Sequence, residues 1–276
     1  MSSRASEMAA DRSTFAPALA LLPGALKADV GCLYRVLRTL DDLVDEDDPR
    51  APERVAAVEC WARGERANTP ETRVLEDLAR RYPLPREALM EFCAGMRHDI
   101  ARASVQDEED FARYCQQAGG SVGIVLATML GTTHPDGESK IATLGRAMQV
   151  TNILRDIDED LTRGRLYISG TTIERFGFPA PGAREALLRD HIARADALFE
   201  EGSGAIPLLV DGRRAIALAA SLYREILRQL ERDGFGAKPG RATVPIWRIR
   251  VLSAKHRFKL STAAPEETGV LGQSVR

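Results

Sequence analysis

Apolar residues recur every three to four positions along most of this 276-residue chain, and the strict alternation typical of β-strands is nearly absent. Helical spacing gathers apolar side chains on one face of each helix, and that face must pack against other helices. We therefore expect an all-α bundle. The predicted helices cover residues 24–46, a segment started by Pro49 and Pro52, a segment opened by Pro70, then 86–101, 111–131 in two pieces meeting at Gly119-Gly120, 140–161, 171–176, 182–201, 211–233 and a last helix from about Arg241.

The chain shows no internal repeat and no long linker, and its turns are short and rich in Pro and Gly. This pattern predicts a single all-α domain over residues 13–260. Residues 1–12 are expected to form a flexible N-terminus without a signal-peptide core. Residues 261–276, with the run Thr-Ala-Ala-Pro-Glu-Glu-Thr-Gly, are expected to form a disordered tail.

Two acidic clusters, well separated in the sequence, lie inside predicted helices. Each contains an Asp-x-x-x-Asp pair, Asp41/Asp45 and Asp156/Asp160. Residues at this spacing share one helix face, so the like charges repel and weaken the helix. Mg²⁺ compensates for such repulsion, because it binds one or two carboxylates together with substrate phosphates. The pairs predict a site for a diphosphate held through bridging metal ions.

Polar neighbours strengthen this interpretation for both clusters. Gln149 and Asn152 lie on the same helix face as Asp156 and Asp160. Nearby arginines supply guanidinium groups, which bind phosphate in a bidentate manner. Either cluster alone is equally well explained as a solvated acidic helix end. The predicted companions of the two clusters are Arg38 and Asp42 for the first, and Arg155, Arg163 and Arg165 for the second.

Bulk composition narrows the classes of partner. The net charge of −2 argues against a nucleic-acid-binding surface, which usually carries a basic excess. The four cysteines show no CxxC spacing, which favours reduced thiols and a cytoplasmic protein. No stretch is long and apolar enough to predict an integral membrane segment. Transient association with a membrane surface is compatible with apolar substrates, although the sequence shows no anchor, and it does not disclose the oligomeric state.

Longer motifs around the clusters resemble the squalene/phytoene synthase family. The first motif is Arg-x-x-Asp-Asp-x-x-Asp-Glu, from Arg38 to Glu46, and the second is Asn-Ile-Leu-Arg-Asp-x-x-Glu-Asp-x-x-x-Gly-Arg-x-Tyr, from Asn152 to Tyr167. Further agreement comes from Leu21-Leu22-Pro23, Gly95-Met96-Arg97-His98-Asp99, Tyr114-Cys115 and Leu222-Tyr223-Arg224. The resemblance spans about residues 13–250.

This resemblance implies an isoprenoid-synthase-type helical bundle around a central cavity, with the acidic clusters on opposite walls. It implies metal binding by Asp41, Asp42, Asp45, Asn152, Asp156 and Asp160. It implies contacts to the substrate diphosphate from Arg38, Gln149, Asn152, Arg155, Arg165 and Arg241. It also places Tyr34, Tyr114, Tyr167 and Tyr223, together with Arg38, at the reaction centre.

The activity implied by the resemblance is Mg²⁺-dependent head-to-head condensation of two prenyl diphosphates. The expected substrates are two geranylgeranyl diphosphates, which give phytoene through a cyclopropylcarbinyl diphosphate. Alternatives are a squalene-type synthase acting on farnesyl diphosphate, a class I terpene cyclase ionising one diphosphate, and a non-catalytic scaffold, which the intact aspartates disfavour. Mn²⁺ is an expected substitute metal. NADPH is not expected, because phytoene formation ends with loss of a proton.

Several positions are smaller here than in relatives. Gly31 lies three residues before Tyr34, where some relatives that use a C15 donor have tryptophan, and Ala16, Ala18 and Ala20 follow the Ser13-Thr14-Phe15 segment. One interpretation is neutral drift with repacking. The other is a wider prenyl tunnel suited to a C20 donor, because smaller side chains open volume unless the site collapses.

Overall fold

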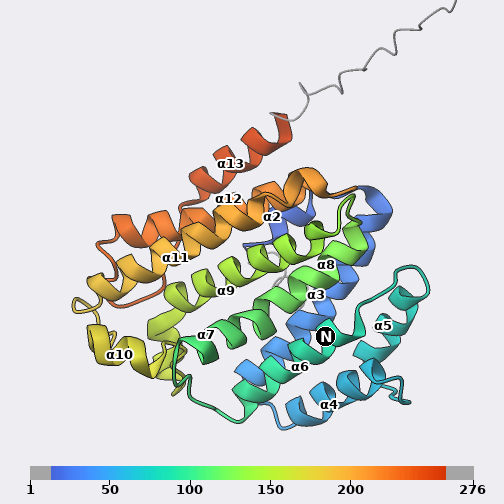
Figure 1. Ribbon diagram of the computed structural model, residues 1–276, viewed down its shortest axis with the longest axis horizontal. Coiled ribbons are helices and arrows are strands. Elements are labelled where there is room, and N and C mark those ends of the chain that lie inside the picture. The colour runs from blue at the N-terminus through green and yellow to red at the C-terminus, as the bar shows by residue number, and fades with distance from the viewer. Residues whose placement is uncertain (1–13, 259–276) are drawn as a thin grey trace, which may run out of the picture.

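Helices dominate the computed structural model, which describes residues 14–258 (Figure 1). The elements are α2 (Ala16–Leu19), α3 (Gly24–Asp45), α4 (Ala51–Ala62), α5 (Pro70–Ala79), α6 (Arg86–Ile100), α7 (Glu108–Cys115), η1 (Gln116–Gly120), α8 (Ser121–Leu130), α9 (Asp136–Thr162), α10 (Gly170–Phe176), α11 (Glu185–Ser203), η2 (Ile206–Leu208), α12 (Arg213–Arg232) and α13 (Ile246–Phe258). Within these residues the β pairing is limited to one bridge, Thr132–Leu209. The all-α prediction is therefore confirmed, while the predicted flexible N-terminus (1–12) and disordered tail (261–276) lie outside the described residues.

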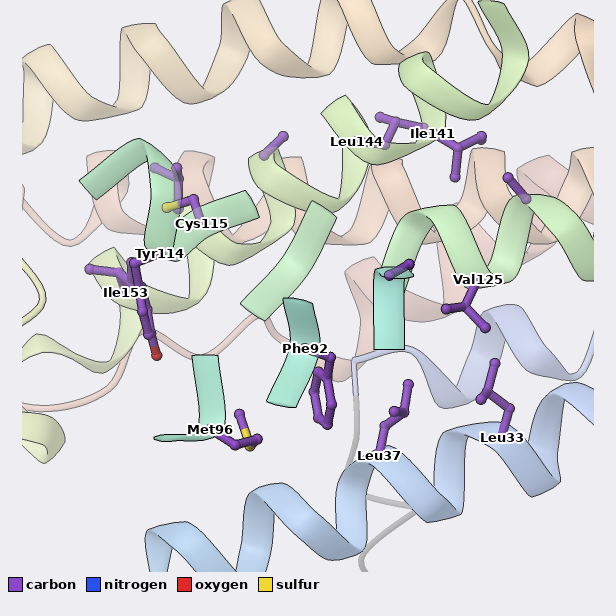
Figure 2. Packing of buried hydrophobic residues seen from close by; sticks show 14 of the residues in the cluster. Leu33, Leu37, Phe92, Met96, Tyr114, Cys115, Val125, Ile141, Leu144 and Ile153 are labelled. Carbon is purple, nitrogen blue, oxygen red and sulfur yellow. The ribbon is translucent and has the colours of Figure 1, made fainter. Parts of the chain in front are cut away.

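Helix α3 carries the first acidic cluster and ends within one residue of its predicted bound. Its buried face includes Val30, Leu33, Leu37, Leu40 and Val44, at helical spacing. This face packs against α4, α5, α6 and α8. Figure 2 shows the α3 side chains Leu33 and Leu37 directed into the same core as side chains of α6 and α8. Packing of this face holds the Asp-x-x-x-Asp pair in a fixed orientation.

Helix α9 carries the second cluster and packs against α7, η1, α8, α11 and α12. The helix begins at Asp136, four residues before the predicted start, directly after Pro135, with Asp136 and Glu138 in its first turn, where acidic side chains favour a helix. Glycine allows close approach at its crossing with η1. A Cβ atom on Gly119 would lie 2.4 Å from the carbonyl oxygen of Gly145, so neither position tolerates a side chain without a shift. The glycines at this crossing let η1 and α9 approach closely, so their small size does not enlarge a cavity here.

The segment predicted as two helical pieces meeting at Gly119-Gly120 is instead continuous. A π-helical turn, η1, joins α7 to α8. Such turns insert a residue into an α-helix and often occur at functional sites. A Cβ atom on Gly120 would lie 2.2 Å from Oε1 of Gln116, so a side chain at position 120 would displace the Gln116 side chain.

The last helix begins at Ile246, not near Arg241 as predicted. Pro245 is compatible with the start of a helix but not its interior, and residues 234–245 form a loop. Arg241 lies in this loop. The loop is held against α9, because the Gly240 amide donates to Asp158 Oδ2 at 2.7 Å. Within the described residues, no helix combines the length and the apolar content that a transmembrane span requires.

Candidate active site

The first acidic cluster is organised by Arg38, one turn before it on α3. Its guanidinium contacts Asp41 Oδ2 and Asp42 Oδ1, both at 2.7 Å. Burial among protein atoms and the neighbouring Asp45 raise the pKa of Asp41 to about 7, and Arg38 opposes this shift. The Asp41 side chain nevertheless keeps 40% of its surface accessible. The Asp41 carboxyl group is therefore surrounded by protein atoms yet open to solvent.

Asp45 joins the first cluster to the segment that follows α9. Arg165 forms an ion pair with Asp45 and donates to the carbonyl oxygen of Val44 at 2.7 Å. Arg163 lies 3.7 Å from the other Asp45 oxygen. Arg165 is buried, with 5% of its surface exposed. Its two contacts hold the end of α3 against the end of α9.

The second cluster is centred on Asp156. Arg155 binds both its oxygens, with Nε–Oδ1 at 2.8 Å and Nη2–Oδ2 at 2.6 Å. Arg241 reaches Asp156 Oδ1 from the loop, at 3.1 Å, and also contacts Glu159 at 3.5 Å. Two cations from separate elements therefore converge on one carboxylate.

Asp160 connects the two clusters electrostatically. Burial raises its pKa to about 7, and the carboxylates of Asp156 and Asp45 add to the shift. Asp45 belongs to α3, so the pairs predicted to act together lie within range of each other's charge.

Asn152 and Tyr223 lie beside the second cluster. The Asn152 Nδ2 atom contacts Gln149 Oε1 at 3.5 Å, whereas its Oδ1 atom is buried without a hydrogen-bond partner in the described part of the chain. Burial raises the pKa of Tyr223, whose charged or ionisable neighbours include Arg155 and Tyr34. The α3 tyrosine, which stacks on Phe15 at 6.1 Å, thus reaches the same region.

Tyr114 and Tyr167 form a stacked pair, with ring centroids 4.7 Å apart. Their hydroxyl groups donate to the two oxygens of Asp99, at 3.1 and 2.9 Å. Burial is the main reason that the pKa values of both tyrosines are raised. Sequence reasoning assigned no role to Asp99, although Asp99 ends one of the motifs that carry the resemblance. The signal available in the sequence was the position of Asp99 in that motif, near the end of the helix predicted over residues 86–101.

The residues present fit a divalent cation shared with a substrate. Among residues 14–258, no three Asp, Glu, His or Cys side chains gather closely enough to hold a metal alone. Mg²⁺ does not require such a cage, because it keeps several waters and binds phosphate oxygens. Burial, with the charge of neighbouring carboxylates, raises the pKa values of Asp41 and Asp160, so a cation would favour their ionised forms. Asn152 Oδ1 is a further oxygen atom without a hydrogen-bond partner among residues 14–258.

One hollow of about 600 Å³ lies elsewhere, along α5 and the loop before it. Its lining includes Trp61, Thr72 and Glu76 and contains none of the predicted site residues. We locate the candidate site at the acidic clusters, because the paired carboxylates, the convergent arginines and the buried tyrosines are found there.

Comparison with known proteins identifies the fold and the family. A crystal structure of a dehydrosqualene synthase in complex with ligand superimposes with a TM-score of 0.83 at 27% identity, covering 94% of this chain and 96% of that one. The fold is thus the helical isoprenoid-synthase fold. Phytoene synthase from Thermus thermophilus is 34% identical over 260 residues, 89% of this chain and 88% of the relative. Presqualene diphosphate synthase from Rhodopseudomonas palustris is 33% identical over 180 residues, 62% of this chain and 63% of the relative.

A family model described as squalene/phytoene synthase matches residues 8–248. The chain therefore belongs to the squalene/phytoene synthase family and is an enzyme of the prenyltransferase type.

Proposed function

We propose that this enzyme condenses two geranylgeranyl diphosphates head to head, giving phytoene for carotenoid biosynthesis. The observation that carries the proposal is the junction of the two Asp-x-x-x-Asp pairs, in which Arg163 and Arg165, just after Asp160, pair with Asp45 of α3. Relatives named phytoene synthase, aligned over most of the chain, favour this product.

Mg²⁺ would be held by Asp41, Asp45, Asp156 and Asp160, with Asp42 and Asn152 as supporting ligands. When bound, the metal stabilises negative charge on the departing diphosphate. The site arginines are paired with these aspartates in the structure. We infer that Arg38, Arg155 and Arg241 contact diphosphate oxygens when substrate is bound; a Mg²⁺ ion held by the aspartates would then supply the positive charge that the arginines provide here.

Arg165 has a different proposed role from the other site arginines. It is buried and its contacts go to Asp45 and to the Val44 carbonyl. We infer that it holds Asp45 in place, while its contact with diphosphate stays a prediction. Gln149, whose described contact is with Asn152, supports that residue.

Carbocation chemistry requires an enclosure that excludes water. We assign this role to the tyrosines of the site and the apolar core around them. Tyr114 and Tyr167 present stacked rings, and Asp99 fixes their hydroxyl groups. An aromatic face stabilises a cation electrostatically, so the pair is suited to line the path of the cyclopropylcarbinyl rearrangement. Tyr34 and Tyr223 approach from α3 and α12.

Squalene-type use of farnesyl diphosphate is the second candidate. Relatives named presqualene diphosphate synthase and dehydrosqualene synthase favour it. Space around Gly31 favours the longer donor, because a Cβ atom at this position would meet only Arg35 Nη1, at 3.7 Å. A Gly31→Trp variant should therefore lose use of geranylgeranyl diphosphate more than use of farnesyl diphosphate. Competition between the two donors measures this ratio, and an unchanged ratio would remove Gly31 from the account of donor length.

One assay tests the function. The purified protein is incubated with Mg²⁺ and either donor, with and without NADPH, and the hydrocarbons are identified by mass spectrometry. Phytoene from geranylgeranyl diphosphate, independent of NADPH, is the expected product. An Asp156→Asn variant is the inactive control. A cyclic product made without coupling, or no product from either donor, would contradict the proposal.

A further inference from the structure

Helix α13 lies on the outer side of α12, at the edge of the bundle (Figure 1). Its inner face is anchored by Ile249 and Leu252, which pack against buried residues of α12. Polar contacts add to this packing. His256 Nε2 lies 2.9 Å from Ser221 Oγ, and Arg248 Nη1 lies 2.9 Å from Glu225 Oε1. Helix α13 is therefore held firmly on one side.

The outer face of α13 is also apolar. Ile246, Trp247 and Val251 are 62%, 56% and 58% exposed. They are three of the five large hydrophobic residues that are exposed in the described part of the chain. Trp247, Val251 and the exposed Ala254 follow one another at spacings of four and three, so they form a strip along one helix face. This outer strip is the largest concentration of exposed apolar side chains on one element.

Cations flank the outer strip. Arg250, Lys255 and Arg257 are exposed and have no ion-pair partner among residues 14–258. The sequence from Gly234 to Pro265 contains no Asp or Glu, although the whole chain carries a net charge of −2. Positive charge is therefore concentrated around the outer strip and is not balanced locally.

The exposed apolar strip and its flanking cations together distinguish between two possible binding partners, a second copy of the chain and a membrane surface. In a symmetric contact with a second copy, the unpaired cations of both copies would meet around the two-fold axis and repel. A bilayer containing anionic lipid complements both properties, because apolar side chains enter the headgroup region while Arg and Lys bind lipid phosphates. We propose that α13 docks this enzyme on an anionic membrane surface through the outer strip.

The sequence did not reveal this anchor because α13 is apolar on both faces. The inner face packs on α12 and the outer strip is proposed to contact the membrane, so the sequence of α13 does not show one apolar and one polar face. The inference rests on exposure and charge alone and holds whichever prenyl diphosphate the enzyme uses.

Sedimentation with lipid vesicles tests the proposal on the full chain. One vesicle is pure phosphatidylcholine, and the other contains about one third phosphatidylglycerol, which gives a negative surface potential. Two variants alter the outer strip, Trp247→Ser/Val251→Ser and Arg250→Glu/Arg257→Glu. The matched control is Val210→Ser/Arg73→Glu, which changes an exposed apolar residue and an exposed cation away from α13. Thermal melting confirms that each variant is folded.

Wild type and control should bind the anionic vesicles, and each α13 variant should bind about tenfold or more weakly. Binding should fall as salt is raised, since the Debye length shortens. Emission from Trp247 should shift to shorter wavelength on binding, because this side chain is exposed whereas Trp61 is buried. Failure of wild type to bind, or equal binding by the α13 variants, would overturn the proposal. So would gel filtration showing a wild-type dimer that the α13 variants abolish.

Discussion

The carboxylate of Asp99 accepts hydrogen bonds from both Tyr114 and Tyr167. Its side chain is 7% exposed, so these hydroxyl groups have little access to water as an alternative partner. One residue therefore fixes two aromatic rings of the site. Its own helix, α6, carries neither acidic cluster, which makes Asp99 a link between the core and the reaction centre.

Asp99→Ala should lower the free energy of unfolding by about 2–5 kcal/mol, because the buried hydroxyl group of Tyr114 and the partly buried one of Tyr167 lose their acceptor. Urea-induced unfolding measures this loss. Asp77→Ala is the control, since Asp77 is exposed and pairs with Arg80 on the surface. If both variants had the wild-type free energy of unfolding, the Asp99 hydrogen bonds would be energetically unimportant.

At the scale of elements, Glu108 ties α7 to α10 and α11. It accepts a hydrogen bond from Thr172 Oγ1 at 2.6 Å and contacts Ser169 and Arg194. Burial opposes its charged form, but these contacts outweigh burial and lower the pKa of Glu108 from 4.5 to about 2. A depressed pKa in the folded state stabilises the fold above pH 4.5, and this contribution is lost as the pH falls towards 2.

Glu108→Gln should therefore melt about 2–4 °C below wild type at pH 7, and this difference should shrink at pH 3. Thermal unfolding monitored by circular dichroism at both pH values measures it. Glu109→Gln is the neighbouring control, because Glu109 is 86% exposed. A difference that stayed constant between pH 7 and pH 3 would show that the ionised carboxylate is not responsible.

The loop carrying Arg241 is positioned by a second set of contacts between elements. Arg184 is buried and binds both oxygens of Asp158, at 2.6 and 2.7 Å, and the same carboxylate accepts from Gly240. Gly236 has φ +70°, and a Cβ atom there would lie 2.2 Å from Arg184 Nε. Asp158 thus faces away from the metal ligands predicted on α9 and holds the loop from the outside.

Gly236→Ala should reduce kcat/KM at least about tenfold with unchanged helical content, because displacement of Arg184 releases the Arg241 loop. Gly64→Ala is the matched control. Gly64 also has a positive φ, +86°, but its Cβ would meet nothing within 4 Å. Both variants carry the backbone strain of about 1–2 kcal/mol, so only the clash distinguishes them. Equal activity in the two variants would contradict this positioning role.

For the whole molecule, helical spacing and breakers predicted the elements that carry the clusters. The buried face of α3 and the polar stripe of α9 both follow the local sequence. Contacts between distant segments were not predictable in this way. The pairing of Asp158 with Arg184 and the sharing of Asp99 by two tyrosines depend on packing, which one sequence does not encode locally. The start of α13 was predicted too early because apolar spacing continues through the loop before Pro245.

The central claim is that two distant clusters form one metal-dependent diphosphate site. Asp160 and Asp45 come from α9 and α3, which are distant in the sequence, and the charge of Asp45 reaches Asp160 only in the folded bundle. Isothermal titration with inorganic diphosphate, in the presence and absence of Mg²⁺, measures this most directly. Without Mg²⁺, or in either Asp41→Asn or Asp156→Asn, affinity should fall at least about tenfold, a loss of about 1.4 kcal/mol, while Asp77→Asn should bind as wild type. Equal affinity with and without Mg²⁺, or an unaffected variant of either cluster, would contradict the account.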